Sequence, residues 1–412
     1  MKIYKSIRER VVSLRICHMI PGFFPIAKGG AEIFALNLCI NLIKKGNEVY
    51  LITRNLNFPC EETIEGVLVR RFSNILPYKI KYYGFGEFVR SKYIRILVAL
   101  FDLIGAIPTL LNLHRKKQLE VLHASFILPF GLLGVIIRKL LKIPLVITVH
   151  GPADFYEVPH FFDPILRFVL KKADKVIVVS PKLKKDILRR LGKLSLKLIC
   201  NGVSLDPYMD FGNVIQTSLY GISSKDFIIL TAGRLVKRKN LHLLIQAMPK
   251  ILEKIPTCKI ILLGRGIEKG HLKNLIEKLQ LTTKIIMPGW IAEERKVELF
   301  KRADIFIQLS QVEGLSLAFL ESKAAGIPAV VVKTEDRQRK VNSDKNAGGL
   351  IDPPITIEKI VDNIIYLYQN FEVRQKMRID VRSEAEKLYS LEKMVENYNQ
   401  VFQNFTKRRG IL

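Results

Sequence analysis

The chain has 412 residues, 49% of them hydrophobic and 25% charged, so it can bury a sizeable core, and two domains are the default expectation. Its 66 Lys and Arg residues outnumber its 38 Asp and Glu residues to give a net charge of +28, which predicts an anionic partner: a phosphate-bearing substrate, an acidic membrane surface or nucleic acid. The five cysteines are scattered, without a C-x-x-C or a Cys/His cluster, which argues against a disulfide scaffold and a structural zinc site and favours a reducing cytosol.

Residues 1–15 are basic, but charged side chains interrupt their apolar runs, so we expect no secretory signal. The nearest approach to a membrane span is residues 96–113. This stretch contains Asp102 and Pro108 and barely reaches the length that a span needs. We therefore expect a buried or membrane-surface helix there rather than a transmembrane one.

Apolar, β-branched runs alternate with helical patterns along the first half of the chain. Strands are predicted at residues 14–19, 48–53, 67–72, 120–123, 145–150, 175–180 and 196–200, and helices at residues 31–44, 131–141 and 181–191. Continuous apolar strands separated by helices are typical of a parallel sheet that is covered on both faces.

The alternation then pauses at a stretch rich in Gly, Asn, Ser, Asp and Pro, which predicts a linker near residues 203–224. It resumes with strands predicted at residues 227–232, 259–263, 284–287, 304–309 and 328–332. The sequence thus predicts an α/β protein with two Rossmann-like, doubly wound domains, residues 1–205 and residues 206–390, followed by a C-terminal helix in residues 391–412.

The charge is unevenly distributed between the predicted domains. Residues 1–205 hold 33 basic and 14 acidic side chains, so they carry +19 of the total +28. Either the surface is generally rich in lysine and solvated, or the first domain faces anionic lipid or an anionic acceptor. Aromatic and basic residues are mixed at 79–92, directly before an apolar stretch, which suits an interfacial anchor; an ordinary acceptor-side loop is the alternative.

Two motifs follow predicted strands of the first domain. Gly29 and Gly30 lie at a strand-to-helix turn, where missing Cβ atoms and free helix N–H groups suit a phosphate, although a tight turn without a ligand has the same pattern. His150 ends another strand and precedes Gly151. Because ligands of open α/β sheets bind beyond the carboxyl ends of strands, we interpret His150 as a site residue rather than a core histidine.

A third motif, LTAGRLVKRKN, follows the first predicted strand of the second domain. It contains Arg234 and, five residues later, Lys239. A planar guanidinium and a compact ammonium can together hold a diphosphate, although a basic loop is the alternative. Lys237 and Arg238 lie between them and are expected to face solvent.

A fourth motif, EGLSLAFLE, follows another strand of the second domain and begins and ends with a carboxylate. If the segment is helical, Glu313 and Glu321 lie about 12 Å apart. Glycosidase carboxyl pairs lie about 5–9.5 Å apart, so we expect these two to grip different parts of one elongated ligand instead. Gly314, Leu315 and Ser316 would open a helix whose N–H groups meet phosphate.

Two further observations narrow the chemistry. The G-x-G of Gly264 and Gly266 lacks the full G-x-G-x-x-G spacing and lies mid-chain, so it gives little support to a nicotinamide site. The sequence contains no Asp-x-Asp and no Cys/His/Asp ligand cluster.

Taken in order, these motifs resemble glycosyltransferase family four, whose members are retaining, nucleotide-sugar-dependent transferases with the two-Rossmann GT-B fold. The resemblance rests on GGAE at 29–32, the strand-end His150, ADKVIVVS at 173–180, NGV at 201–203, GRLVKRK at 233–239 and the E-x7-E of Glu313 and Glu321. It runs from about residue 13 to about residue 405.

The resemblance implies a role for each matching residue. Arg234 and Lys239 would hold the donor diphosphate, the Gly29–Gly30 loop would approach it from the other domain, Glu313 would bind the donor sugar, Glu321 the nucleotide ribose, and His150 the sugar near the reacting carbon. The family uses no metal, so no metal and no other cofactor are expected. The two domains would face each other across a cleft, and residues 391–405 would cross back to the first domain.

The chain departs from the family at two places. Asn240 stands where many relatives have Gly, and we expect it to cap the following helix. Residues 333–345 are polar and charged where many relatives have a Gly-rich loop. The resemblance therefore does not predict how the donor pocket closes at this loop.

The expected function is a metal-independent hexosyltransferase that moves a sugar from a UDP- or GDP-linked donor to a glycan or lipid-linked acceptor. We expect the protein in the cytoplasm, peripheral on the inner face of the membrane, and no nucleic-acid partner, because no nucleic-acid-binding motif is visible. The alternatives are a non-catalytic nucleotide-sugar-binding protein and another GT-B enzyme, such as a nucleotide-sugar epimerase or a phosphorylase.

Overall fold

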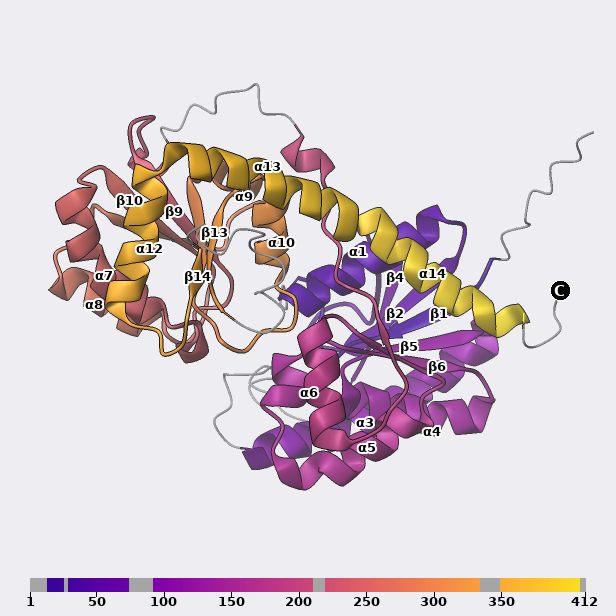
Figure 1. The fold of residues 1–412 in the computed structure, drawn as a ribbon. Helices are drawn as coiled ribbons and strands as arrows, with labels where there is room; N and C mark the ends of the chain where they lie inside the picture. The colour runs from indigo at the N-terminus through magenta and orange to yellow at the C-terminus, as the bar shows by residue number, and fades with distance from the viewer. Residues whose placement is uncertain (1–12, 26–28, 74–91, 210–218, 334–348, 408–412) are drawn as a thin grey trace, which may run out of the picture.

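The computed structural model describes residues 13–25, 29–73, 92–209, 219–333 and 349–407 (Figure 1). These residues form two β-sheets, each with its own helices and hydrophobic cores. The predicted α/β class with two doubly wound sheets is therefore confirmed. The predicted domain boundaries at residues 205/206 and 390/391 stay predictions.

The first sheet has eight strands in the order β3-β4-β2-β1-β5-β6-β7-β8. They are β1 (Arg15–Met19), β2 (Glu48–Arg54), β3 (Glu61–Ile64), β4 (Val67–Phe72), β5 (Val121–Ser125), β6 (Leu145–Val149), β7 (Lys175–Val178) and β8 (Leu196–Leu198). All neighbours are parallel except β3, which pairs antiparallel with β4. β3 was not predicted, because this edge strand has the sequence EETI and no apolar run.

Helices cover both faces of this sheet. They are α1 (Gly30–Lys44), α3 (Lys92–Lys117), α4 (Leu132–Leu141), α5 (Asp163–Lys172) and α6 (Pro181–Leu191). The apolar sides of α3, α4, α5 and α6 share one core with the sheet, and α1 forms the core on the opposite face. The continuous apolar strands of the sequence follow from this arrangement, because both sides of each central strand are buried.

The second sheet has six parallel strands in the order β11-β10-β9-β12-β13-β14. They are β9 (Phe227–Ala232), β10 (Cys258–Leu263), β11 (Ile285–Gly289), β12 (Ile305–Gln308), β13 (Ala329–Val332) and β14 (Leu350–Ile351). The helices that follow β9 are α7 (Leu241–Lys254), α8 (Lys269–Lys278), α9 (Glu293–Arg302), α10 (Leu317–Ala324), α12 (Ile357–Gln369), α13 (Phe371–Leu388) and α14 (Leu391–Lys407). β14 was not predicted, because it is only two residues long.

The chain passes between the two sheets at two places, and these lie side by side. The Val203 N–H donates to the Tyr389 carbonyl at 2.8 Å, and the Leu391 N–H donates to the Val203 carbonyl at 3.0 Å. Beyond this contact, α14 runs onto the first domain and packs against α1 (Figure 1). The core residues Tyr398 and Phe402 of α14 are fully buried there. The last helix thus adds to the core of the first domain.

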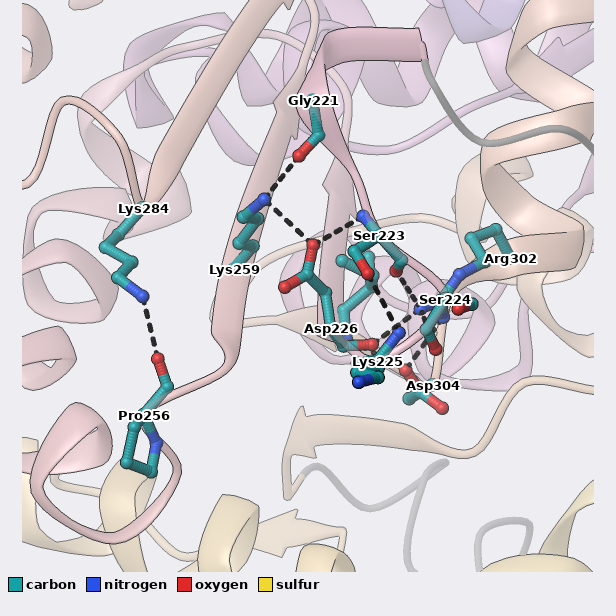
Figure 2. Close-up of polar contacts among 11 residues, drawn as sticks. Gly221, Ser223, Ser224, Lys225, Asp226, Pro256, Lys259, Lys284, Arg302 and Asp304 are labelled. Carbon is teal, nitrogen blue, oxygen red and sulfur yellow. Dashed lines mark hydrogen bonds and ion pairs between the residues drawn. The ribbon is translucent and has the colours of Figure 1, made fainter.

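Charged side chains form hydrogen bonds and ion pairs with the segment directly before β9, at the amino ends of the strands of the second sheet (Figure 2). The Asp226 carboxylate accepts from the Ser223 N–H at 2.6 Å and pairs with Lys259 Nζ at 2.8 Å. Arg302 Nη2 donates to the Asp226 carbonyl at 2.6 Å. Ligands of such sheets bind at the carboxyl ends of the strands, so this cluster lies at the end of the sheet away from the expected ligand.

The helix predicted at residues 96–113 lies within α3 and is partly buried. Asp102 is its one carboxylate, and it is buried against Arg54, whose Nε lies 2.7 Å from Asp102 Oδ1. Ala106 and Leu110 are also buried, whereas Ile104 is 63% exposed. Within the described ranges, no helix combines the length and apolar character needed to cross a bilayer.

We expect the Arg54–Asp102 pair to hold α3 on the sheet. Substituting Asp102→Ala leaves the buried Arg54 guanidinium without this carboxylate, which should lower the free energy of unfolding by about 3–5 kcal/mol in urea titrations. The matched control is Glu277→Ala, which breaks an exposed pair with Lys273 on α8 and should leave the urea midpoint near that of the wild type. Equal midpoints for Asp102→Ala and the control would contradict this role.

Candidate functional site

Two glycine-containing loops, one at the carboxyl ends of the strands of each sheet, contact each other. His150 and Gly151 follow β6, and Gly314 follows β12 in the other domain. The approach is so close that a Cβ on Gly314 would lie 2.0 Å from the His150 carbonyl oxygen. In addition, Asn201 Nδ2 donates to the Leu315 carbonyl at 2.8 Å. The structure therefore brings His150, Gly314 and Leu315 of the predicted site together.

The Glu313 carboxylate is held by cations from the loop after β9. Lys239 Nζ lies 2.5 Å from Glu313 Oε1, and Arg238 Nη1 lies 3.5 Å from the same oxygen. Burial raises the pKa of Glu313, but the nearby Lys239 and Arg238 outweigh it and hold the pKa below the usual value. The carboxylate is therefore ionised at neutral pH and can accept hydrogen bonds.

The prediction that Arg238 faces solvent is wrong. Its Nε lies 3.3 Å from Glu157 Oε1, in the loop after β6, so the guanidinium bridges Glu157 of the first domain and Glu313 of the second. No local pattern in the sequence indicates this contact, because it depends on how the two domains pack. Lys237, by contrast, is exposed as predicted.

Arg234 and Lys239 have different surroundings. Lys239 is engaged with Glu313, whereas Arg234 is exposed and, within the described parts of the chain, pairs with no carboxylate. Asn240 has φ +52°, in the left-handed region that Asn tolerates and Gly prefers, which accounts physically for Gly at this place in relatives. Asn240 is the first residue before α7, but its side chain does not cap that helix; Nδ2 donates to the Leu309 carbonyl at the end of β12 instead.

Glu321 forms a second, separate pair. Its Oε1 accepts from Lys296 Nζ at 2.8 Å, and Lys296 also lies 2.7 Å from Glu293. Burial raises the pKa of Glu321, and Lys296 opposes that effect. Glu321 is on α10 but Glu313 is not, because that helix begins at Leu317. The expected helical connection between the two carboxylates is therefore wrong, and Lys296 is a contact that sequence reasoning missed.

Gly314, Leu315 and Ser316 were predicted to begin a helix. Only Ser316 lies at the start of α10. Ser316 is the N-cap of α10, and its hydroxyl accepts from the Phe319 N–H at 3.4 Å. Gly314 and Leu315 belong to the loop that contacts the first domain.

Gly29 and Gly30 lie at the start of α1, where a phosphate was expected. The side chain of Glu32 lies at this turn. A Cβ on Gly29 would lie 2.6 Å from Glu32 Oε2, so the Glu32 carboxylate folds back over the helix start beside this glycine. Burial raises the pKa of Glu32, while hydrogen bonds from its own N–H and that of Gly29, together with the nearby Arg234, oppose the shift. Arg234 thus acts electrostatically on the start of α1 in the other domain.

His150 has its ring in a mostly aromatic surrounding. The rings of Phe34 and Phe126 lie 4.9 and 5.3 Å from it, centroid to centroid, and Nε2 lies 3.2 Å from the Ser125 hydroxyl. Burial lowers the pKa of His150 to about 3, so the ring is neutral at pH 7. Asp154 accepts the His150 N–H at 2.9 Å and thereby fixes the backbone of this loop.

The G-x-G of Gly264 and Gly266 has a packing role. A Cβ on Gly264 would lie 1.8 Å from the Gly233 carbonyl oxygen, and one on Gly266 would lie 2.1 Å from the Leu235 carbonyl oxygen. The two glycines therefore let the loop after β10 pack against the loop after β9. The polar loop at residues 333–345, apart from Lys333, lies outside the described residues. Within the described ranges, His, Cys, Asp and Glu side chains form no group of three that could hold a metal ion.

Two Rossmann-like sheets that meet at the carboxyl ends of their strands are the arrangement of the GT-B fold. Family models agree along the chain: "Glycosyltransferase Family 4" matches residues 28–207, and "Glycosyl transferases group 1" matches residues 218–384. The chain belongs to glycosyltransferase family four, the retaining transferases that take a sugar from a nucleotide sugar.

Known proteins resemble the chain along nearly its whole length. The alpha-monoglucosyldiacylglycerol synthase of Acholeplasma laidlawii is 23% identical over 92% of this chain and 95% of its own. Among solved structures, sucrose-phosphate synthase from Thermosynechococcus elongatus superposes with a TM-score of 0.80 at 19% identity over 96% of this chain and all of its own. Alr3699/HepE from Anabaena, solved with UDP and glucose, superposes with a TM-score of 0.74 at 16% identity over 95% of this chain and all of its own.

Two histidines with a lowered pKa, the buried His18 and the partly buried His150, make stability depend on pH. Burial lowers the pKa of both His18 and His150 from 6.5 to about 3, so between those values the folded protein binds fewer protons than the unfolded chain. Stability is therefore fully present above pH 6.5 and falls as the pH drops below it, by about 1.4 kcal/mol per pH unit for each such histidine. His18→Phe should make the decline between pH 6.5 and pH 5 shallower by about that amount in urea titrations. An unchanged slope would contradict the assignment of His18 as a buried neutral group.

Proposed function

We propose that the chain is a metal-independent, retaining hexosyltransferase. It transfers a sugar from a UDP- or GDP-linked donor to a glycan or lipid-linked acceptor at the cytoplasmic face of a membrane. The observation that carries this proposal is the group of Arg234, Lys239 and Glu313 at the meeting of the two sheets. It supplies cations for a diphosphate and an ionised carboxylate for sugar hydroxyls. No nucleic-acid partner is proposed.

The donor occupies the second domain, and each charged group has a task. Arg234 and Lys239 hold the diphosphate, and they stabilise the negative charge that develops on it as the glycosidic bond breaks. Once both cations hold the diphosphate, the charge that develops on it meets partners that are already in contact. Lys239 turns from Glu313 to the diphosphate, which frees Glu313 to accept from the hydroxyls of the sugar.

The remaining predicted residues complete the donor site. Glu321 accepts from the ribose with the oxygen that Lys296 does not occupy. His150, neutral and fixed through its backbone, contacts the sugar near the reacting carbon. The turn at Gly29 and Gly30 approaches the diphosphate, together with Gly314, Leu315 and Ser316 from the second domain.

The donor assignment predicts a nucleotide-dependent stabilisation that depends on Arg234. In thermal-shift assays with EDTA, either UDP or GDP, but not ADP, should stabilise the wild type, by about 2.7 kcal/mol when the nucleotide concentration is a hundred times its Kd. Arg234→Ala should weaken this binding at least tenfold. Arg189→Ala, which removes an exposed arginine from α6, is the control and should bind as the wild type does. Stabilisation by no nucleotide, in folded protein, would contradict the assignment.

The proposed membrane contact is supported by the outer side of α3, α4 and α5, which we call the outer helical face. Six large apolar side chains of these helices are exposed, namely Leu100, Ile104, Ile136, Leu140, Ile165 and Phe168, and Phe161 in the turn before α5 is exposed as well. Exposed lysines accompany them, namely Lys139, Lys142, Lys171 and Lys172. The acidic residues of these helices are paired, Asp102 with Arg54 and Asp163 with Arg190.

Exposed apolar side chains accompanied by lysines fit an anionic bilayer better than water, because lipid headgroups attract the lysines while the acyl region takes up the apolar side chains. The name of the Acholeplasma relative, a glucosyldiacylglycerol synthase, supports a lipid acceptor. The basic segment at residues 79–92, which was predicted to contribute, lies outside the described residues apart from Lys92.

The outer helical face predicts binding to anionic vesicles. The double variant Ile104→Glu/Leu140→Glu should bind phosphatidylglycerol vesicles at least tenfold more weakly than the wild type in co-sedimentation. The control, Ile379→Glu, changes a 72%-exposed isoleucine of α13 and should bind as the wild type does. Equal binding of the double variant, or no binding of the wild type, would overturn the proposed contact.

The alternative functions give different products. A nucleotide-sugar epimerase converts the donor without any acceptor, and a non-catalytic binding protein is stabilised by the nucleotide but forms no glycoside. Incubation of the stabilising nucleotide sugar with and without a lipid extract, followed by analysis of both sugar and lipid, distinguishes all three.

A further inference from the structure

Two further histidines lie beneath His150, and the proposed reaction leaves them without a task. His18 in β1 and His123 in β5 are fully buried, and their rings meet edge to face at 4.5 Å. Burial lowers the pKa of His18 to about 3 and that of His123 well below its usual value, so both rings are neutral. A neutral imidazole has one N–H donor and one acceptor nitrogen, and its surroundings decide which nitrogen has the proton.

The Ser125 hydroxyl at the end of β5 connects His18 to His150. Its Oγ lies 3.1 Å from His18 Nε2 and 3.2 Å from His150 Nε2. A hydroxyl has a single proton, so it can donate to one of these nitrogens only and must accept from the other. If both contacts are hydrogen bonds, one histidine has its proton on Nε2 and the other has it on Nδ1.

We propose that Ser125 and His18 are positioning residues for His150: the shared hydroxyl holds the His150 ring in a single neutral tautomer, opposite to that of His18. The proposal rests on the proposed function, in which His150 contacts the donor sugar. Because Ser125 occupies Nε2, Nδ1 is the nitrogen left to meet the substrate. The tautomer therefore decides whether His150 donates to a sugar oxygen or accepts from a sugar hydroxyl.

The surroundings make this constraint rigid. Phe34 and Phe126 pack against the His150 ring, and Tyr398 of α14 packs against Phe34 at 5.6 Å. On the other side, His123 Nε2 lies 2.8 Å from the Thr148 hydroxyl, which in turn lies 2.9 Å from the Tyr398 hydroxyl. His123 is thus engaged elsewhere, and Ser125 is the polar partner that His18 and His150 share.

The direct test is nitrogen NMR of protein labelled with ¹⁵N-histidine, which gives the protonation of each ring nitrogen. The chain has seven histidines, so the signals can be assigned by single substitutions. In the wild type, His18 and His150 should show opposite protonation at Nε2, each as a single tautomer. In Ser125→Ala and in His18→Phe, His150 should become a mixture of tautomers, whereas Ser125→Thr keeps the hydroxyl and should keep the wild-type signal.

Kinetics supply the second measurement. With the donor that binds, Ser125→Ala should lower kcat roughly three- to tenfold with little change in the donor KM, because one neutral hydrogen bond is lost. Ser125→Thr should restore kcat. Thr356→Ala is the control, since it removes a hydroxyl that caps α12 in the second domain and should leave kcat unchanged.

Two results would overturn the proposal: the same Nε2 protonation state in His18 and His150, or a His150 tautomer that is unaffected in both Ser125→Ala and His18→Phe. If Ser125→Ala does not fold, His18→Phe and Ser125→Thr decide the matter alone. If the wild type transfers no sugar, the proposed function fails, while the NMR signals still show whether the hydroxyl sets the tautomers.

Discussion

The ion pair between Glu313 and Lys239 is the interaction on which the proposed site depends. A carboxylate buried where two domains meet is destabilising unless a cation compensates it, and Lys239 and Arg238 supply that charge. Arg238 reaches Glu157 as well, so the same charges that stabilise the carboxylate also connect the two domains. A diphosphate that enters this place must replace Glu313 as the partner of Lys239, so donor binding and local domain contact are coupled.

Much of the fold could be predicted from the sequence, because it depends on local patterns. Long apolar runs at regular spacing identify buried parallel strands, and twelve predicted strands correspond to strands of the structure. Strands without an apolar run could not be found in this way. Glu61–Ile64 has a polar sequence at a sheet edge, and Leu350–Ile351 is too short to show a period.

The site was harder to predict than the fold, because its partners come from distant segments. Residue type and position at strand ends were enough to select His150, Arg234 and Glu313. The partners Arg238 and Lys296 carry no such signal, because their roles depend on the packing of loops and helices far apart in sequence. Glu32 was visible in its motif, but its return over Gly29 follows from the geometry of the turn.

A crystal structure of the protein with the nucleoside diphosphate that stabilises it would show directly whether Lys239 exchanges Glu313 for the donor. We expect the diphosphate within hydrogen-bond distance of Arg234 and Lys239, with the Lys239–Glu313 pair opened and Glu313 facing the space for the sugar. A diphosphate bound elsewhere, or one bound here with that ion pair intact, would contradict this expectation.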